Sequence, residues 1–151
     1  MPLGRGGKQI KKTMNNETQK IIDHSFEYAK ELLEETGEFY PFGAYLDKRG
    51  QVHPLEFELD KKNMPTNGQV IDGLTIYCKE EMEKGNIKAY GITFDAGVQM
   101  KEGENAVDTI AIDITLLGDE IEPVYYFPYQ IEGQSQVIFG ETFAVKREDF
   151  S

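Results

Sequence analysis

The stretch AVDTIAIDITLL, residues 106–117, alternates large aliphatic side chains with smaller or polar ones. The aliphatic residues at every second position are Ile110, Ile112, Ile114 and Leu116. This period of two is typical of a β-strand that turns one face toward a core. Asp113 lies between two of the isoleucines and therefore belongs to the opposite face. The pattern predicts a strand whose apolar face another layer must cover.

Three further segments near this strand have a similar period. IKAYGITFDAGVQM, residues 87–100, precedes the strand, and VYYFPYQI, residues 124–131, follows it. The last segment is QVIFGETFAVKRE, residues 136–148, in which Glu141 interrupts an apolar face. Short polar turns separate the four segments, so we expect four consecutive antiparallel strands.

Two earlier segments predict a β-hairpin. PFGAYLD, residues 41–47, and QVHPLEFELD, residues 51–60, flank a loop whose glycine suits a left-handed backbone conformation. From Leu55 to Leu59, apolar residues alternate with glutamate. We therefore expect the return strand to continue through this stretch.

Two segments have a helical period instead. NNETQKIIDHSFEYAKELLEETG, residues 15–37, begins with asparagines that can cap a helix and ends with a glycine that can stop it. MPTNGQVIDGLTIYCKEEMEKGN, residues 64–86, contains Thr66 and Gln69 at the spacing of a capping box. The predicted element order is α-β-β-α-β-β-β-β. We expect an α+β two-layer sandwich, an antiparallel sheet with two helices packed on one face.

Charge is unevenly distributed along the chain, whose formal net charge is −11. Residues 1–13 contain four basic and no acidic side chains, and we expect a mobile basic N-terminal segment there. Residues 14–151, expected to form a single α+β domain, carry 12 basic and 27 acidic residues, a net charge of −15. Such a domain repels nucleic-acid phosphates and attracts basic proteins. We therefore expect a basic protein partner and no nucleic acid.

Several function classes lack their sequence signatures. The chain has no phosphate-binding loop, nucleophile elbow or zinc motif, and its one cysteine, Cys78, lies on the apolar stripe of the second predicted helix. We expect no metal, no cofactor and no catalysis. No apolar run reaches the length of a membrane span, and the basic N-terminal residues lack the apolar core of a signal peptide. These features favour a cytoplasmic protein without a membrane partner.

The candidate binding residues come from two aromatic segments and a few unusual polar positions. FYPFGAY, residues 39–45, and YYFPYQ, residues 125–130, are both rich in aromatic side chains and broken by proline. Core packing accounts for part of each segment, and the remaining tyrosines suit recognition of a protein surface. The histidine of the hairpin is a further candidate, because the return strand places it near the first aromatic segment. The candidates are Phe39, Tyr40, Tyr45, His53, Tyr125, Tyr126, Tyr129, Asp113 and Glu141.

The stretch GEFYPFGAYLDKRGQVHPLEFE, residues 37–58, resembles the hairpin of small, mostly uncharacterised bacterial α+β proteins. In those proteins an aromatic-Pro-Phe-Gly strand precedes a glycine turn and a return strand that contains proline. The chain is also similar to small acidic families, some of which act as immunity proteins or antitoxins. The resemblance implies non-catalytic neutralisation of a protein partner and no catalytic residues.

These observations lead to one expected function and two alternatives. We expect an acidic cytoplasmic protein that acts as a non-catalytic protein-binding module, with an immunity-like or regulatory role. The first alternative is a small-molecule-binding protein or enzyme with a tyrosine-lined pocket near His53. The second is a homodimer formed through an uncovered face of the sheet.

Overall fold

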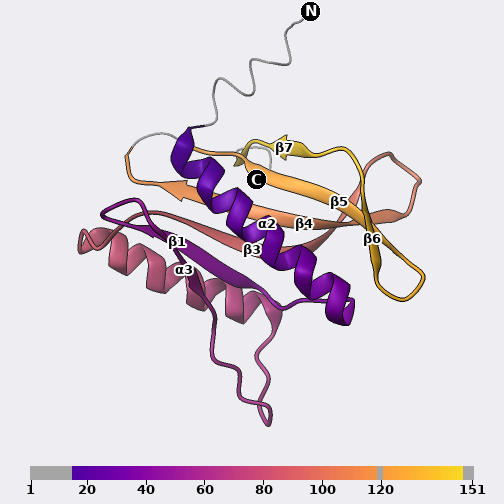
Figure 1. Ribbon diagram of the computed structural model, residues 1–151, viewed down its shortest axis with the longest axis horizontal. Coiled ribbons are helices and arrows are strands. Elements are labelled where there is room, and N and C mark those ends of the chain that lie inside the picture. The colour runs from indigo at the N-terminus through magenta and orange to yellow at the C-terminus, as the bar shows by residue number, and fades with distance from the viewer. Residues whose placement is uncertain (1–14, 119–120, 148–151) are drawn as a thin grey trace, which may run out of the picture.

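The computed structural model describes residues 15–118 and 121–147 of the 151-residue chain. In this part of the chain, two helices pack against one antiparallel sheet (Figure 1). The basic segment predicted at residues 1–13 lies outside the described residues. The helices and strands, in chain order, are α2 (Asn16–Thr36), β1 (Phe42–Asp47), β2 (Val52–Leu55), α3 (Asn67–Glu83), β3 (Ile87–Gln99), β4 (Ala106–Leu116), β5 (Val124–Glu132), β6 (Gln136–Phe139) and β7 (Phe143–Val145).

The sheet has the strand order β2-β1-β3-β4-β5-β6, and β7 pairs with β5. All of these pairs are antiparallel. The ladder between β3 and β4 extends from Ala89 opposite Leu116 to Gln99 opposite Ala106, and it forms the middle of the sheet. The predicted α+β class and the antiparallel sheet are confirmed.

The last predicted strand is interrupted and forms β6 and β7. β6 pairs with residues 129–132 of β5, and β7 pairs with residues 124–126. Between them, Gly140 N donates a hydrogen bond to Pro128 O at 2.9 Å. Proline has no N–H to return this bond, so the ladder stops at Pro128 and resumes with its register shifted by one residue.

The two helices cover opposite faces of the sheet, so the prediction that both pack on one face is wrong. α2 packs over β1, β3 and β4, and α3 packs over β1 and β3 from the other side (Figure 1). A Cβ atom at Gly91 of β3 would clash with Ile21 of α2, whereas the next residue, Ile92, packs in one cluster with Leu74 of α3. Adjacent residues of a strand point to opposite faces, and this half of β3 is therefore buried on both sides.

The helix ends have the local chemistry that was predicted. Asn15 Oδ1 accepts a hydrogen bond from Thr18 N at 2.8 Å, and α2 ends where Gly37 adopts a left-handed conformation with φ of 81°. At the start of α3, Thr66 and Gln69 form the reciprocal capping box. Neither of the described helices is long and apolar enough to cross a membrane.

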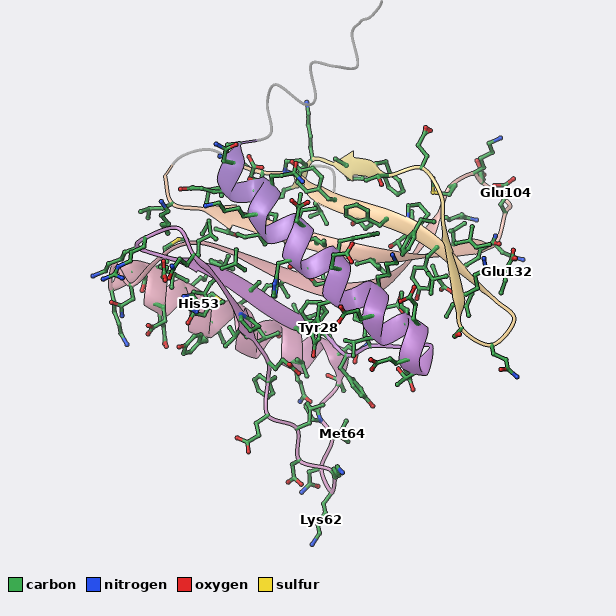
Figure 2. All side chains as sticks on the ribbon, in the orientation of Figure 1. Tyr28, His53, Lys62, Met64, Glu104 and Glu132 are labelled. Atoms are coloured by element: carbon green, nitrogen blue, oxygen red, sulfur yellow. The ribbon has the colours of Figure 1, made fainter. Side chains whose placement is uncertain are left out.

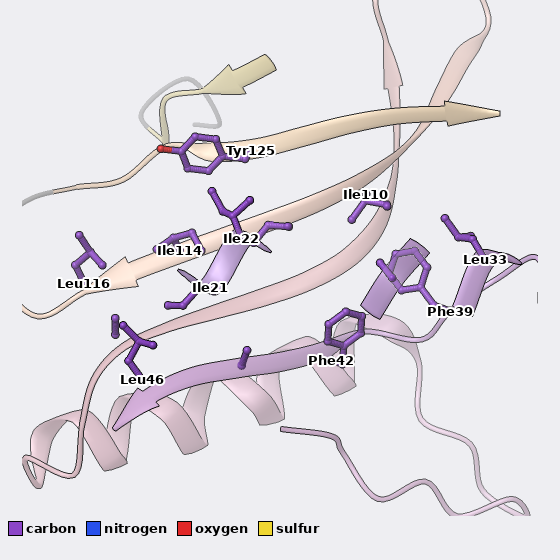
Figure 3. Close-up of a cluster of buried hydrophobic side chains, with 14 of the residues drawn as sticks. Ile21, Ile22, Leu33, Phe39, Phe42, Leu46, Ile110, Ile114, Leu116 and Tyr125 are labelled. Carbon is purple, nitrogen blue, oxygen red and sulfur yellow. The ribbon is translucent and has the colours of Figure 1, made fainter. Parts of the chain in front are cut away.

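The main core lies between α2 and the sheet (Figure 3). Its centre is the aliphatic face of β4, where Ile110, Ile112 and Ile114 are fully buried. Burying a side chain of this size stabilises the fold by about 1.5–3 kcal/mol. α2 comes close to the sheet at Gly91, where an added Cβ would lie 2.6 Å from Ile21 Cγ2. Figure 3 shows Ile21, Ile110 and Ile114 on one side of the sheet and α3 on the other.

A buried carboxylate ties the start of α2 to the sheet. Glu122 is 8% exposed, and its Oε1 accepts hydrogen bonds from Thr18 Oγ1 at 3.0 Å and from Tyr125 Oη at 3.4 Å. Burial and the Glu122 charge raise the pKa of Tyr125 to about 12. Thr18 lies in the first turn of α2, where the helix dipole is positive and favours a nearby negative charge.

Two buried threonines allow a matched test of hydrogen bonding in the core. Thr93 Oγ1 has no hydrogen-bond partner among the described residues, whereas Thr109 Oγ1 donates to Ala96 O at 2.8 Å. We predict that Thr93→Val raises the free energy of unfolding by about 1 kcal/mol, because it removes an unpaired polar atom and keeps the side-chain shape. Thr109→Val should lower the free energy of unfolding by a similar amount. Urea unfolding measures both changes, and equal changes of the same sign would contradict this assignment.

Candidate functional site

A groove lies between the C-terminal half of α2 and the loop that follows β2. Its cavity has a volume of about 330 Å³. Figure 2 shows Tyr28 beside α2, with Lys62 and Met64 farther out on the loop. Among the described residues, no lysine, arginine or histidine side chain lines this cavity. Six of its lining residues define what we call the acidic groove: Tyr28, Glu38, Phe39, Tyr40, Glu56 and Phe57.

The end of α2 forms one wall and the floor of the acidic groove. After Gly37 turns the chain, Phe39 and Phe42 pack beneath the helix and are buried. The ring of Tyr28 meets that of Phe42 edge-on, with 4.8 Å between the ring centroids. Tyr40 is 49% exposed and lies at the rim. The floor is therefore apolar, and one aromatic ring at the rim remains accessible.

The opposite wall comes from a segment that was predicted to be strand. β2 ends at Leu55, so the expected continuation of the strand to Leu59 is wrong. Phe57 instead packs against Gly73 of α3, where an added Cβ would lie 2.3 Å from the ring. Because α3 lies behind the sheet, the chain must leave the sheet plane here to reach it. This departure places Glu56 and Phe57 across the groove from α2.

The two charged residues in the described lining of the acidic groove, Glu38 and Glu56, are both acidic. Tyr28 Oη donates a hydrogen bond to Glu56 Oε1 at 2.9 Å. Burial, this hydrogen bond and the charges of Glu56, Glu31 and Glu35 raise the pKa of Tyr28. None of the four ion pairs between described residues involves these glutamates or Glu38. The carboxylates at the groove therefore lack a described cationic partner.

The end of α2 itself adds to this negative potential. Glu31, Glu34 and Glu35 lie in its last two turns, and its last turn has no basic residue. A helix C-terminus carries a partial negative charge, so carboxylates at this end are unfavourable, whereas lysine or arginine would be favourable. Glu38 follows one residue beyond the glycine cap. The helix dipole and the carboxylates of Glu31, Glu35 and Glu38 thus act in the same direction at the groove.

Two of the candidate residues from the first aromatic segment belong to the acidic groove. Phe39 forms part of its floor and Tyr40 part of its rim. Tyr45 lies on the other face of β1, where its ring stacks on that of His53 with centroids 5.1 Å apart. His53 Nε2 lies 2.7 Å from Asp47 Oδ2, so this pair orients the histidine within the hairpin.

The tyrosines of the second aromatic segment do not join the first. β1 and β5 are separated by β3 and β4, so the two aromatic segments lie on different strands of a wide sheet. Tyr125 and Tyr129 are buried in the core under α2, and Tyr129 Oη donates to Asp95 Oδ2 at 3.1 Å. Burial and Asp95 raise the pKa of Tyr129. Tyr126 is buried on the opposite face, stacked on Phe143.

The two acidic candidates also lie apart from the groove. Asp113 does occupy the face opposite the isoleucines, but it is half-buried and paired with Arg147. Burial raises the pKa of Asp113, and the Arg147 charge partly opposes that rise. Arg147 also donates to Ile114 O at 2.8 Å, so the pair anchors the segment after β7 to β4. Glu141 is exposed where β6 and β7 are interrupted.

The sequence interpretation missed Tyr28, Glu38, Glu56 and Phe57. The sequence does contain a feature that points to Tyr28 and Glu38. EYAKELLEETGE, residues 27–38, concentrates acidic residues at the C-terminal end of a predicted helix. Cys78 is a buried free thiol whose pKa burial raises to about 12. Among the described residues, no group of three or more His, Cys, Asp or Glu side chains could hold a metal ion.

Comparisons with protein-family models, with curated proteins and with solved structures found no match to this chain. The chemistry of the site therefore rests on its own residues. An apolar floor, exposed aromatic rings and unpaired carboxylates can bind a cationic group that has apolar neighbours.

The Asp47–His53 pair makes the hairpin sensitive to acid. The His53 contact and backbone N–H groups of residues 51 and 49 hold the pKa of Asp47 at about 2, below its ordinary value of 3.8. Ionised Asp47 therefore stabilises the fold above about pH 4, and we predict that this contribution is lost as the pH falls to about 2. An NMR titration of the Asp47 carboxyl carbon should have its midpoint near 2, and His53→Ala should raise that midpoint. A midpoint near 3.8 in the wild-type chain would contradict the assignment.

The crowded carboxylates at the end of α2 should reduce stability. We predict that Glu35→Gln raises the free energy of unfolding by about 0.5 kcal/mol, because it removes a charge that the helix dipole and its neighbours repel. Glu17→Gln is the matched control, since Glu17 lies in the first turn of α2 and pairs with Lys88 at 3.1 Å. That change should lower stability. Thermal unfolding at low salt measures both, and a loss of stability in Glu35→Gln would contradict the prediction.

Proposed function

We propose that this protein is a non-catalytic, cytoplasmic binding module whose acidic groove takes a basic segment of a partner protein. The observation that carries the proposal is the set of carboxylates around an apolar groove, with no basic side chain among the described residues that line it. The resemblance of the hairpin to small bacterial proteins and to acidic immunity families favours an immunity-like or regulatory role. In such a role the module neutralises or holds its partner by binding it, without catalysing a reaction.

The charge of the chain supports recognition in two stages. The net charge of −15 on residues 14–151 steers a basic partner toward the protein and speeds the encounter at low salt. Docking then depends on apolar contact, which Tyr40 at 49% exposure and Phe57 at 39% exposure can supply. Aromatic side chains of this kind dominate the energy of many protein interfaces. Electrostatic steering and apolar docking thus both direct the partner to the acidic groove.

The two alternative functions have weaker support. Among the candidate tyrosines, only Tyr45 is in ring contact with His53, which gives little basis for a tyrosine-lined pocket there. For a homodimer, residues of β3, β4, β5 and β7 form a small apolar cluster on the face of the sheet that α3 covers at β1 and β3. Phe94 and Phe143 of this cluster are half-buried. Light scattering distinguishes a dimer from a monomer.

The proposed function predicts which peptides the protein selects. From a displayed library of random ten-residue peptides, the wild-type chain should enrich sequences with net positive charge and apolar residues. A groove variant, Glu38→Gln with Glu56→Gln, should lose this enrichment. The matched control is Glu102→Gln with Glu104→Gln, which removes the same charge from an exposed loop. Figure 2 shows Glu104 at another end of the molecule.

The control variant should select the same peptides as the wild-type chain. Binding of the enriched peptides should also weaken steeply with added salt. The proposal fails if neutral or acidic peptides are enriched. It also fails if the groove variant and the control variant lose binding equally, because net charge alone would then explain recognition.

A further inference from the structure

We propose that the acidic groove recognises a guanidinium group, so that the basic segment presents an arginine next to an apolar residue. This inference rests on the proposed function and specifies its ligand. The guanidinium pairs with Glu56 and lies against the aromatic side chains of the groove. The apolar neighbour contacts the groove floor, where Leu32 and Phe39 line the cavity.

Glu56 is the carboxylate that the structure orients. Its Oε1 accepts the hydrogen bond from Tyr28 Oη at 2.9 Å, which limits rotation of the carboxylate. Tyr28 is itself packed against Phe42, so the hydroxyl is held by the core. A carboxylate in a defined orientation suits the planar fork of donors of a guanidinium better than the three rotating donors of an ammonium. Tyr28 is therefore a positioning residue for Glu56.

The aromatic lining also favours arginine over lysine. Tyr28, Tyr40 and Phe57 all line the same cavity, and Tyr40 and Phe57 keep part of their surface exposed. A guanidinium stacks on aromatic faces and is weakly hydrated, so it loses less on entering an apolar groove than the strongly hydrated ammonium of lysine. The carboxylates at the end of α2 add attraction for either cation. Charge thus selects basic residues, and the rings select arginine among them.

The groove has room for this ligand. Its cavity of about 330 Å³ lies at the lower end of the range for small-molecule sites, which suits one long side chain and part of a neighbouring one. The partner does not need to add a strand to the open edge of β2. Pro54 within β2 lacks the backbone N–H that a full added strand would use. The recognised unit is therefore a side chain with its flanking residue rather than an added strand.

The test uses the full chain and three peptides of sequence Gly-Leu-X-Leu-Gly with blocked ends, where X is arginine, lysine or citrulline. Citrulline keeps the shape of arginine and removes its charge. Titration followed by NMR should give affinities in the order arginine, lysine, citrulline. We expect lysine to bind about threefold and citrulline at least tenfold more weakly than arginine, and a tenfold loss corresponds to about 1.4 kcal/mol. The shifted resonances should include those of Tyr28, Tyr40 and Phe57.

Three variants separate the contributions of Glu56 and Tyr28 to peptide binding from a general effect of charge. Glu56→Gln should weaken arginine binding about tenfold. Tyr28→Phe keeps the ring but frees Glu56, so the ratio of arginine to lysine affinity should fall toward one. A purely structural role for Tyr28 would weaken both peptides equally and leave the ratio unchanged. Glu132→Gln, on an exposed residue at another end of the molecule (Figure 2), is the control and should change neither affinity.

The outcomes distinguish this inference from the proposed function. Equal binding of arginine and lysine peptides, both lost in Glu56→Gln, would overturn the arginine assignment and leave the proposed function standing. Binding of citrulline as tight as that of arginine, or no binding of either cationic peptide, would overturn both. If circular dichroism shows that Glu56→Gln does not fold, Glu38→Gln replaces it and should weaken arginine binding at least threefold.

Discussion

The fold depends on the contact between α2 and the middle of the sheet. The isoleucines of β4 offer a continuous apolar face, and Gly91 on the neighbouring strand lets Ile21 of α2 sit directly against it. This contact places the helix over β1, β3 and β4. The position of the helix then determines where its last turn ends, and the chain after Gly37 must pass beneath it into β1. The position of the acidic groove thus follows from the packing of α2 on the sheet.

Carboxylates have opposite effects on stability at the two ends of α2. At its start, the buried carboxylate of Glu122 accepts hydrogen bonds beside the positive end of the helix dipole, an arrangement that stabilises the fold. At its end, Glu31, Glu34 and Glu35 lie where the dipole is negative, and their charges repel one another. Folded proteins are only marginally stable, so repulsion of this kind is a measurable cost, which the cationic ligand that we propose would relieve.

Interactions between residues close in the sequence were predictable. The asparagine and glycine caps of α2, the Thr66–Gln69 capping box and the apolar alternation of β4 each depend on side chains within a few residues, and all three are present. The faces of the sheet were not predictable in this way. β3 is buried on both faces between Ala89 and Thr93. In the sequence, Tyr90, Ile92 and Phe94 alternate with smaller or polar residues, a pattern that indicates one apolar face and does not reveal a layer on the other.

By itself, the sequence determined the element types, most of their limits, the antiparallel α+β class and the strongly acidic character of the protein. These properties follow from local periodicity, capping and composition, which need no knowledge of distant residues. Only the tertiary structure decided that α3 crosses to the far face, that β2 ends early so that Phe57 can reach Gly73, and that the tyrosines of β1 and β5 never meet. These outcomes depend on packing between segments remote in sequence, where an amphipathic pattern specifies that a face is buried but not what buries it.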